Sequence, residues 1–142
     1  MSGGWNPWAA LREREHLTLR WARLSGCREV VVDRPEGRTV YLDSRLGQRD
    51  RNALLAHALV HDERMLYPPG SPAGIVQREE ECVRRITADR LVPLDQLRDL
   101  IGRLLELGEP VRALDVMEEF DVPVDIANKS LHLLQVRGPT TV

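Results

Sequence analysis

The spacing of apolar residues near the start of the chain predicts a long first helix. Asn6-Pro7 is a favourable helix start, because Asn caps helices well and Pro is tolerated at the first helical position. Two apolar rows then recur at helical spacing, one of Trp8, Leu11, Leu19 and Ala22 and one of Leu17, Trp21 and Leu24. Ser25-Gly26 is a typical helix end. The pattern predicts an amphipathic helix over residues 7–24.

The apolar pattern changes to two strand-like runs after this helix. Residues 30–32 are three valines, and residues 39–42 read Thr-Val-Tyr-Leu. Residues 33–37, Asp-Arg-Pro-Glu-Gly, lie between them and are typical of a turn. We therefore expect an antiparallel β-hairpin. Because two strands alone are marginally stable in water, the hairpin must pack on a helix, and the next segment is the obvious one.

Helical spacing dominates the rest of the chain. Residues 49–66 are expected to form a helix. The three prolines and two glycines of residues 67–74 end this helix and form a loop, which is well placed to border any site on the helix. Further helices are expected over residues 75–91, 95–107, 111–120 and 124–134. The sequence predicts an α+β fold with a first domain over residues 1–93 and a helical subdomain over residues 94–142.

Composition excludes several functional classes. The chain has 142 residues, 42% of them hydrophobic and 30% charged, which is typical of a globular protein. A net charge of −2 gives no overall attraction to nucleic acid or to an anionic membrane. Cys27 and Cys82 lie far apart, which favours free thiols in a reducing compartment. With no apolar leader and no long apolar stretch, we expect a cytoplasmic protein without membrane contact.

The helix over residues 49–66 carries the most informative chemistry. His57 and His61 are four residues apart, so both imidazoles lie on one face, one turn from each other. Two neutral imidazoles held in this way can occupy two corners of a tetrahedral zinc site. In zinc peptidases with an H-E-x-x-H motif, the residue after the first His is the Glu that acts as general base. Here that position holds Ala58.

A third ligand is predicted on the helix over residues 75–91. Its inward row is expected to contain Val76, Glu80, Val83, Thr87 and Leu91. Glu79 and Glu81 are turned about 100° to either side of Glu80. A carboxylate on an apolar row is costly unless it is paired or binds a metal. Glu80 is therefore a candidate carboxylate ligand beside the two histidines.

Two segments together resemble a known family. LLAHALVHDER, residues 54–64, resembles the metal helix of the ImmA/IrrE metallo-endopeptidases, which reads L-x-H-E-[LIVF]-x-H. Glu80-x-x-Val83-x-x-Ile86-x-Ala88-x-x-Leu91-Val92-Pro93 resembles that family's E-x-x-A-x-x-F-A-x-x-L-[LM]-P helix. The resemblance covers roughly residues 50–93 and implies a zincin-like domain, with its hairpin packed on the metal helix. It also implies that His57, His61 and Glu80 bind Zn²⁺. Glu79 is the alternative third ligand, because the register of three successive glutamates is easily misjudged by one residue.

Ala58 is the main departure from the family. A Glu at this position would take a proton from zinc-bound water and pass it to the leaving amine, and alanine does neither. We consider two explanations: an engineered Glu→Ala substitution that traps an inactive form, or a natural pseudo-peptidase. Because the rest of the motif is intact, we favour the engineered change. Asp62 and Glu63 are a further open point, since either can orient a ligand imidazole or simply be a charge at the helix end.

The family implies a function as well as a fold. Its members are zinc-dependent endopeptidases that typically cleave a cytoplasmic helix–turn–helix repressor of the XRE type, in stress or mobile-element circuits. A substrate strand would add to the hairpin edge beside Thr39, Val40 and Tyr41, with its scissile carbonyl at the zinc. The alternative hypothesis is a non-catalytic, zinc-binding regulator that binds a partner protein in the same groove.

The C-terminal helices have a helix–turn–helix rhythm but the wrong charge for DNA. Lys129 is the only basic residue of the last helix, whereas Glu118, Glu119 and Asp121 precede it. A DNA-reading helix needs a basic surface. We expect a packing or substrate-docking subdomain and no direct DNA binding.

Overall fold

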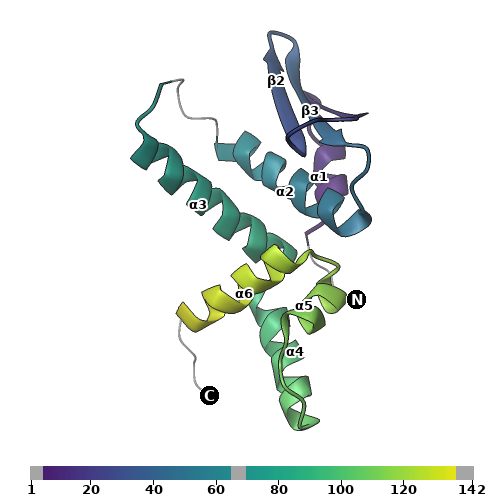
Figure 1. Cartoon of the computed structure of the whole chain (residues 1–142), viewed down its shortest axis with the longest axis vertical. Coiled ribbons are helices and arrows are strands. Elements are labelled where there is room, and N and C mark those ends of the chain that lie inside the picture. Colours follow the sequence, from purple (N-terminus) through teal and green to yellow (C-terminus); the bar gives the residue numbers. More distant parts are fainter. Residues whose placement is uncertain (1–4, 65–69, 137–142) are drawn as a thin grey trace.

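A computed structural model describes residues 5–64 and 70–136 (Figure 1). The described part is α+β, with six helices and one small sheet. The elements run in the order α1 (Pro7–Arg12), β1 (Leu17–Ala22), β2 (Glu29–Arg34), β3 (Gly37–Asp43), α2 (Gln48–Arg64), α3 (Ala73–Leu91), α4 (Leu94–Glu106), α5 (Ala113–Phe120) and α6 (Val124–Val136). In the described residues, no helix is long and apolar enough to cross a membrane. Residues 65–69, which include the first three residues of the predicted loop over residues 67–74, lie outside the described residues.

The predicted helix over residues 7–24 is wrong beyond Arg12. Asn6 caps α1, its side chain accepting hydrogen bonds from the amides of Trp8 and Ala9 at 2.8 and 3.3 Å. The helix then ends, and β1 begins at Leu17. From Leu17, side chains alternate between buried and exposed for four residues, which is the period of a strand. The pairing of β1 with a distant strand outweighs the helical spacing of its apolar residues.

The sheet is mixed, with strand order β1-β3-β2. The predicted antiparallel hairpin is confirmed: β2 and β3 pair from Glu29–Leu42 to Arg34–Gly37 around the two-residue turn Pro35-Glu36. The small antiparallel hairpin or sheet that the sequence predicts is only part of the observed sheet, because β1 pairs parallel with β3, Leu17 opposite Arg38. The strand β3 is therefore central, and the outer side of β2 is a free edge within the described chain.

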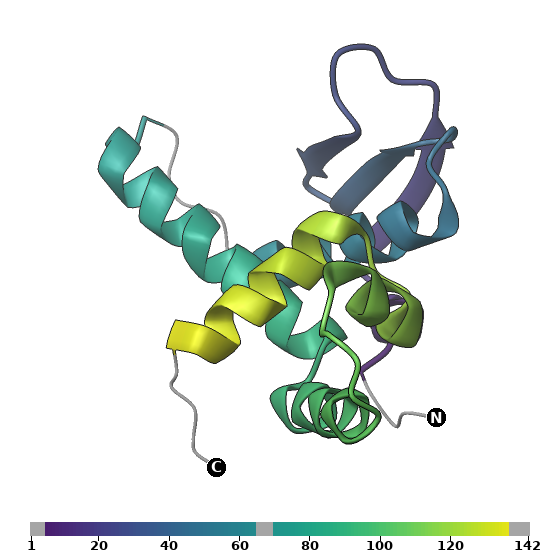
Figure 2. The same ribbon diagram turned by 60° about the horizontal axis from the view of Figure 1, so that its bottom comes forward.

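Two hydrophobic cores hold the molecule together. The first lies between the sheet and α2 and contains Leu17, Val40, Leu42, Leu55, Ala58 and Leu59. The second joins the end of α3 to the C-terminal helices and contains Val92, Leu97, Leu100, Val116, Val122 and Ala127. Helix α3 packs on α2 and also on α6, so it connects the two regions (Figures 1 and 2). The division at residue 93 stays a prediction, although the cores separate near it.

Candidate metal centre

His57 and His61 lie on one face of α2, as their spacing predicts. The surrounding residues Ala53, Leu55, Ala56, Leu59 and Val60 are buried and fix the rotation of the helix against the sheet and α3. The two imidazole centroids are 4.7 Å apart with their planes at 87°. The side chains are only 21% and 16% exposed. Both rings are thus held close together in a partly dry site.

Glu80 of α3 completes a cluster of three possible ligands. Its Oε1 lies 3.5 Å from Nε2 of His57, and its Oε2 lies 2.8 Å from Nε2 of His61. One ligand atom from each of the three residues lies within 4.8 Å of the others. Ligand atoms about 2.0–2.1 Å from a tetrahedral zinc are roughly 3.3 Å from each other. Small side-chain adjustments would therefore bring these atoms to a metal ion.

Glu79, the alternative ligand, is turned away from the histidines. Arg64, the last residue of α2, donates from Nε to Oε2 of Glu79 at 2.5 Å and from Nη2 to Oε1 at 3.1 Å. This bidentate pair occupies both carboxylate oxygens and lowers the pKa of Glu79, chiefly through the hydrogen bond to Arg64. The structure therefore places Glu80, and not Glu79, with the histidines.

Glu29, at the start of β2, belongs to the site and was missed by sequence reasoning. Its Oε1 lies 3.6 Å from Nδ1 of His57, on the side of the ring that faces away from Glu80. Among the described residues, Nδ1 of His57 and Oε2 of Glu29 are buried without a hydrogen-bond partner. A carboxylate facing the second nitrogen of a ligand histidine is a common device for orienting the ring in metal sites. A single Glu before a valine run gives no sequence signal for this role.

The two histidines have opposite pKa shifts. Burial pushes the pKa of His57 down, but the carboxylates of Glu29 and Glu80 raise it by more, so its pKa lies above the ordinary value. Burial, helped by the neighbouring His57, lowers the pKa of His61 despite the opposing charge of Glu80. A lowered pKa favours the neutral form of His61, which is the form that binds a metal.

Ala58 lies in the wall of the metal-site cavity. This cavity of about 340 Å³ is lined by Glu29, Val31, Arg38, Val40, His57, Ala58, His61 and Glu80. Ala58 is only 5% exposed and packs in the first core beside Val40. Its methyl group supplies no proton acceptor. Arg38 is the one cationic side chain in this lining, and it pairs with Asp62 at 2.9 Å.

The predicted substrate edge beside Thr39, Val40 and Tyr41 is wrong. These residues are paired with β1 on one side and with β2 on the other, so their backbone groups already have partners. Val40 still contributes to the cavity lining, whereas Thr39 and Tyr41 do not. Of the two edge strands in the described sheet, β1 and β2, only β2 contributes residues to the cavity lining, namely Glu29 and Val31. Sequence reasoning identified the hairpin but not its neighbour β1, and so chose the wrong edge.

Asp62 and Glu63 do not orient the ligand histidines. Asp62 is bound by His16 at 2.8 Å, by Arg38 at 2.9 Å and by Arg14 at 3.1 Å. Glu63 pairs with Arg14 at 2.5 Å and with Arg90 at 2.6 Å. Asp62 thus ties the N-terminal segment and β3 to the end of α2, and Glu63 ties the N-terminal segment and α3 to it. Their role is to hold the helices that carry the ligands.

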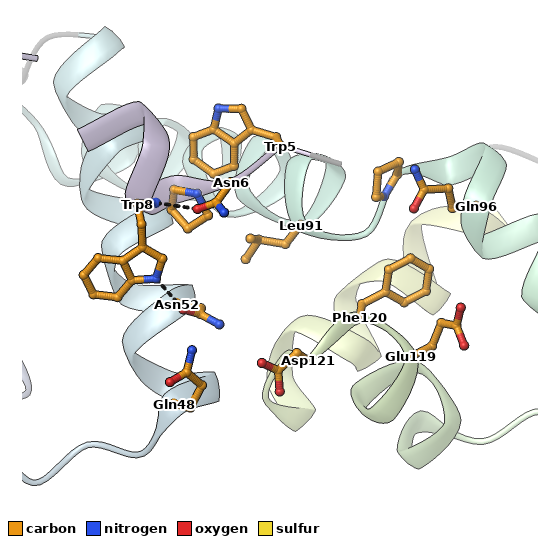
Figure 3. A pocket seen from close by; sticks show the side chains of 12 residues that line it. Trp5, Asn6, Trp8, Gln48, Asn52, Leu91, Gln96, Glu119, Phe120 and Asp121 are labelled. Carbon is orange, nitrogen blue, oxygen red and sulfur yellow. Dashed lines mark hydrogen bonds between the residues drawn. The ribbon is translucent and has the colours of Figure 1, made fainter. Parts of the chain in front are cut away.

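Another cavity lies away from the His57, His61 and Glu80 cluster. It has a volume of about 400 Å³ and lies between α1, the start of α2 and the C-terminal helices (Figure 3). Figure 3 shows Trp5, Leu91 and Phe120 around it, and the Trp8 indole donates to Asn52 at 2.7 Å. Gln48 in its wall precedes His57 by two and a half helical turns and so faces the opposite side of α2. Among the described residues, no histidine or cysteine lines this cavity.

Comparison of the chain with protein-family models, with curated proteins and with solved structures finds no match.

Proposed function

We propose that this protein binds zinc through His57, His61 and Glu80 in a site of the ImmA/IrrE metallo-endopeptidase type. The convergence of these three side chains, two from α2 and one from α3, is the observation that supports this proposal. Two imidazoles and one carboxylate form the donor set of many catalytic zinc sites and leave a fourth position open. Ca²⁺ and Mg²⁺ prefer oxygen donors, so the two nitrogens favour zinc.

A bound zinc would polarise a substrate carbonyl and lower the pKa of its water. The chain's own residues have positioning roles. Glu29 faces Nδ1 of His57 at 3.6 Å and would orient its ring, and the outer edge of β2 offers backbone groups to an extended protein segment. Val30 and Val31 on this strand are 37% and 40% exposed, which is unusual for a free edge unless a partner covers it. We propose β2 as the strand to which a substrate adds.

Ala58 limits what this site can catalyse. Loss of a general acid–base group typically costs about 10²–10⁴-fold in rate. We propose that the scaffold is that of a cytoplasmic endopeptidase acting on a repressor of the XRE type, as the resemblance implies, and that this chain binds its target with little hydrolysis. The same substitution supports the second candidate function, a zinc-dependent regulator that captures a partner protein without cleaving it. The burial of Ala58 in the first core is compatible with both.

Metal analysis and one reverse substitution test the proposal. The protein purified without chelators should contain about one zinc per chain, and His61→Ala should lose it. Ala58→Glu should then produce zinc-dependent cleavage of a co-encoded repressor, whereas Ala58→Gln, of equal size but without a base, should not. A protein without zinc under these conditions would overturn the metal site. Stoichiometric zinc with no cleavage by Ala58→Glu would favour the regulator.

A further inference from the structure

A second cavity adjoins the metal site on the other side of His57. It has a volume of about 350 Å³, and His57 lines both this cavity and the metal-site cavity. We call it the adjoining cavity. Residues from three helices and one loop form it: Arg28, Ala53, Leu54, His57, Arg84, Thr87, Asp125, Ile126 and Lys129. A chain segment bound at the triad can therefore place a side chain directly in it.

The interior of the adjoining cavity is mostly apolar. Ala53 and Leu54 of α2 face Ile126 of α6 across it. Thr87 offers no free proton donor, because its hydroxyl donates to the carbonyl of Val83 at 2.7 Å. An apolar group that enters the cavity is stabilised by burial, by about 25 cal/mol per Å² of apolar surface. The interior thus selects an aliphatic or aromatic side chain.

Three cationic side chains, Arg28, Arg84 and Lys129, contribute to the lining of this cavity. Arg28 is 3.8 Å from Asp50 and Arg84 is 4.0 Å from Glu81, both too far for hydrogen bonds. The side chains of Arg28 and Arg84 are 54% and 59% exposed, so their guanidinium groups remain accessible to a ligand. Lys129 pairs with Glu81. Two cations therefore share the carboxylate of Glu81.

The acidic groups around the cavity do not cancel this positive charge. Asp125 is the one carboxylate in the lining, and its Oδ1 accepts a hydrogen bond from the amide of Ile126 at 3.0 Å. Asp50, which pairs with Arg28, and Glu81, which pairs with Arg84, do not themselves line the cavity. Helix α6 begins at Val124, so its positive end also faces this region. A ligand carboxylate between Arg28 and Arg84 could therefore form shorter ion pairs than those that these two arginines now make with Asp50 and Glu81.

We propose that the adjoining cavity binds an apolar side chain of a protein segment that carries a carboxylate next to this side chain. The apolar group fills the space between α2 and α6, and the carboxylate binds Arg84 and Arg28 at the mouth. This inference rests on the proposed function, because the triad supplies the reason for a protein segment to lie along His57. The carboxylate can come from an Asp or Glu side chain or from a chain terminus, since the chemistry is the same.

Labelled peptides distinguish the carboxylate sources. Fluorescence anisotropy of the full chain, zinc-loaded and metal-free, compares three peptides that share one leucine: one with a neighbouring glutamate, one with a neighbouring lysine and one that ends in leucine with a free carboxylate. We expect the glutamate peptide to bind at least about tenfold more tightly than the lysine peptide. Tight binding of the third peptide alone would assign the cavity to a chain terminus. Equal affinities for all three would overturn the proposal.

Arg84 and Arg85 provide a matched pair of variants. They are adjacent on α3 and both exposed, but only Arg84 lines the cavity. Arg84→Glu should weaken binding of the carboxylate peptide about tenfold or more, whereas Arg85→Glu should change it less than twofold. Equal losses would indicate long-range charge alone and overturn the proposal. Zinc content measured on the same samples distinguishes failure of this proposal from failure of the proposed zinc site. Full zinc content without peptide selectivity would refute only peptide binding by the adjoining cavity. Peptide selectivity without bound zinc would refute only the zinc site.

Discussion

Arg64 donates hydrogen bonds to both carboxylate oxygens of Glu79, at 2.5 and 3.1 Å, so Glu79 has a different partner from its neighbour Glu80. The last residue of α2 reaches across to α3 and fixes the rotation of α3 relative to the two histidines. Glu79 is turned towards Arg64, and Glu80 lies next to both imidazoles. Two adjacent glutamates of identical chemistry thus have different partners, Arg64 for Glu79 and the two histidines for Glu80.

Exchanging each glutamate for glutamine should separate these functions. Glu80→Gln removes a charged ligand and should weaken zinc binding by about 100-fold or more, since even groups behind the ligands contribute about 10–100-fold. Glu79→Gln should weaken it less than tenfold, because only the pair with Arg64 is lost. Competition with a colorimetric zinc chelator measures both affinities. Equal losses in the two variants would contradict the assignment of Glu80 as the ligand.

Glu29 is expected to tune zinc affinity without touching the metal. Glu29→Gln keeps the size of the side chain but removes the charge that faces Nδ1 of His57 at 3.6 Å. Zinc affinity should fall about 10–100-fold, with the stoichiometry unchanged at one. Glu36→Gln, in the hairpin turn and exposed, is the control and should have no effect. A Glu29→Gln variant with the affinity of the parent would show that Glu29 has no part in the site.

The sequence predicted the triad but not the groups that support it. Histidines spaced by four residues and a carboxylate on an apolar helical row are local signals, so they could be read from a helix alone. β1 could not, because its parallel pairing joins Leu17 to Arg38 across a long stretch of chain. The sequence of β1 does alternate between apolar and polar residues, as a strand does. The same leucines and Trp21 also fit helical spacing, so the pattern alone did not decide between the two. The position of Glu29 beside His57 could not be predicted either, because it depends on where β2 lies relative to α2.

Acid should weaken the contact between the N-terminal segment and the two ligand helices. The hydrogen bond from Arg90, opposed by partial burial and supported by Arg14, lowers the pKa of Glu63. A carboxyl with a lowered folded-state pKa stabilises the fold above its unfolded pKa, about 4.3, and this stabilisation is lost as the pH falls through the folded value. Because Glu63 is partly exposed, the effect should be about 1 kcal/mol or less.

Urea unfolding of the metal-free protein at pH 6 and pH 3 measures this contribution. Glu63→Gln should lose less stability than the parent between these two pH values, by the amount that the ionised pair supplies. Glu106→Gln, at an exposed position at the end of α4, should follow the parent. A parent-like pH dependence in Glu63→Gln would place the acid sensitivity elsewhere.

Gly37 is required where the hairpin meets β1. Its φ is 152°, and a Cβ at this position would lie 2.6 Å from the carbonyl oxygen of His16. That same oxygen accepts a hydrogen bond from the amide of Arg38 at 2.7 Å, which starts the pairing of β1 with β3. Gly37→Ala should therefore destabilise the protein by about 1–3 kcal/mol. Gly102→Ala, in open space on α4, should instead stabilise it by roughly 0.5–1 kcal/mol, as thermal unfolding can show.

Ala58→Glu should make the stability of the protein depend more strongly on zinc. A glutamate here would extend from the first core into the metal-site cavity, which already contains the carboxylates of Glu29 and Glu80. Without metal, a third carboxylate in this space should destabilise the fold by about 1–3 kcal/mol, offset only in part by Arg38. A bound divalent cation reverses the sign of this charge effect, because it turns repulsion into attraction.

Thermal unfolding with and without saturating zinc, at matched protein concentrations, tests this expectation against Ala58→Gln. The glutamine variant introduces the same bulk but no charge, so zinc should raise its melting temperature by no more than it raises that of the parent. The glutamate variant should gain more from zinc than either, by about 2–4 °C for each kcal/mol of repulsion relieved in a chain of this size. Equal gains in the two variants would mean that the side chain at position 58 points away from the metal, and the site would then lack room for a general base even when a glutamate is supplied.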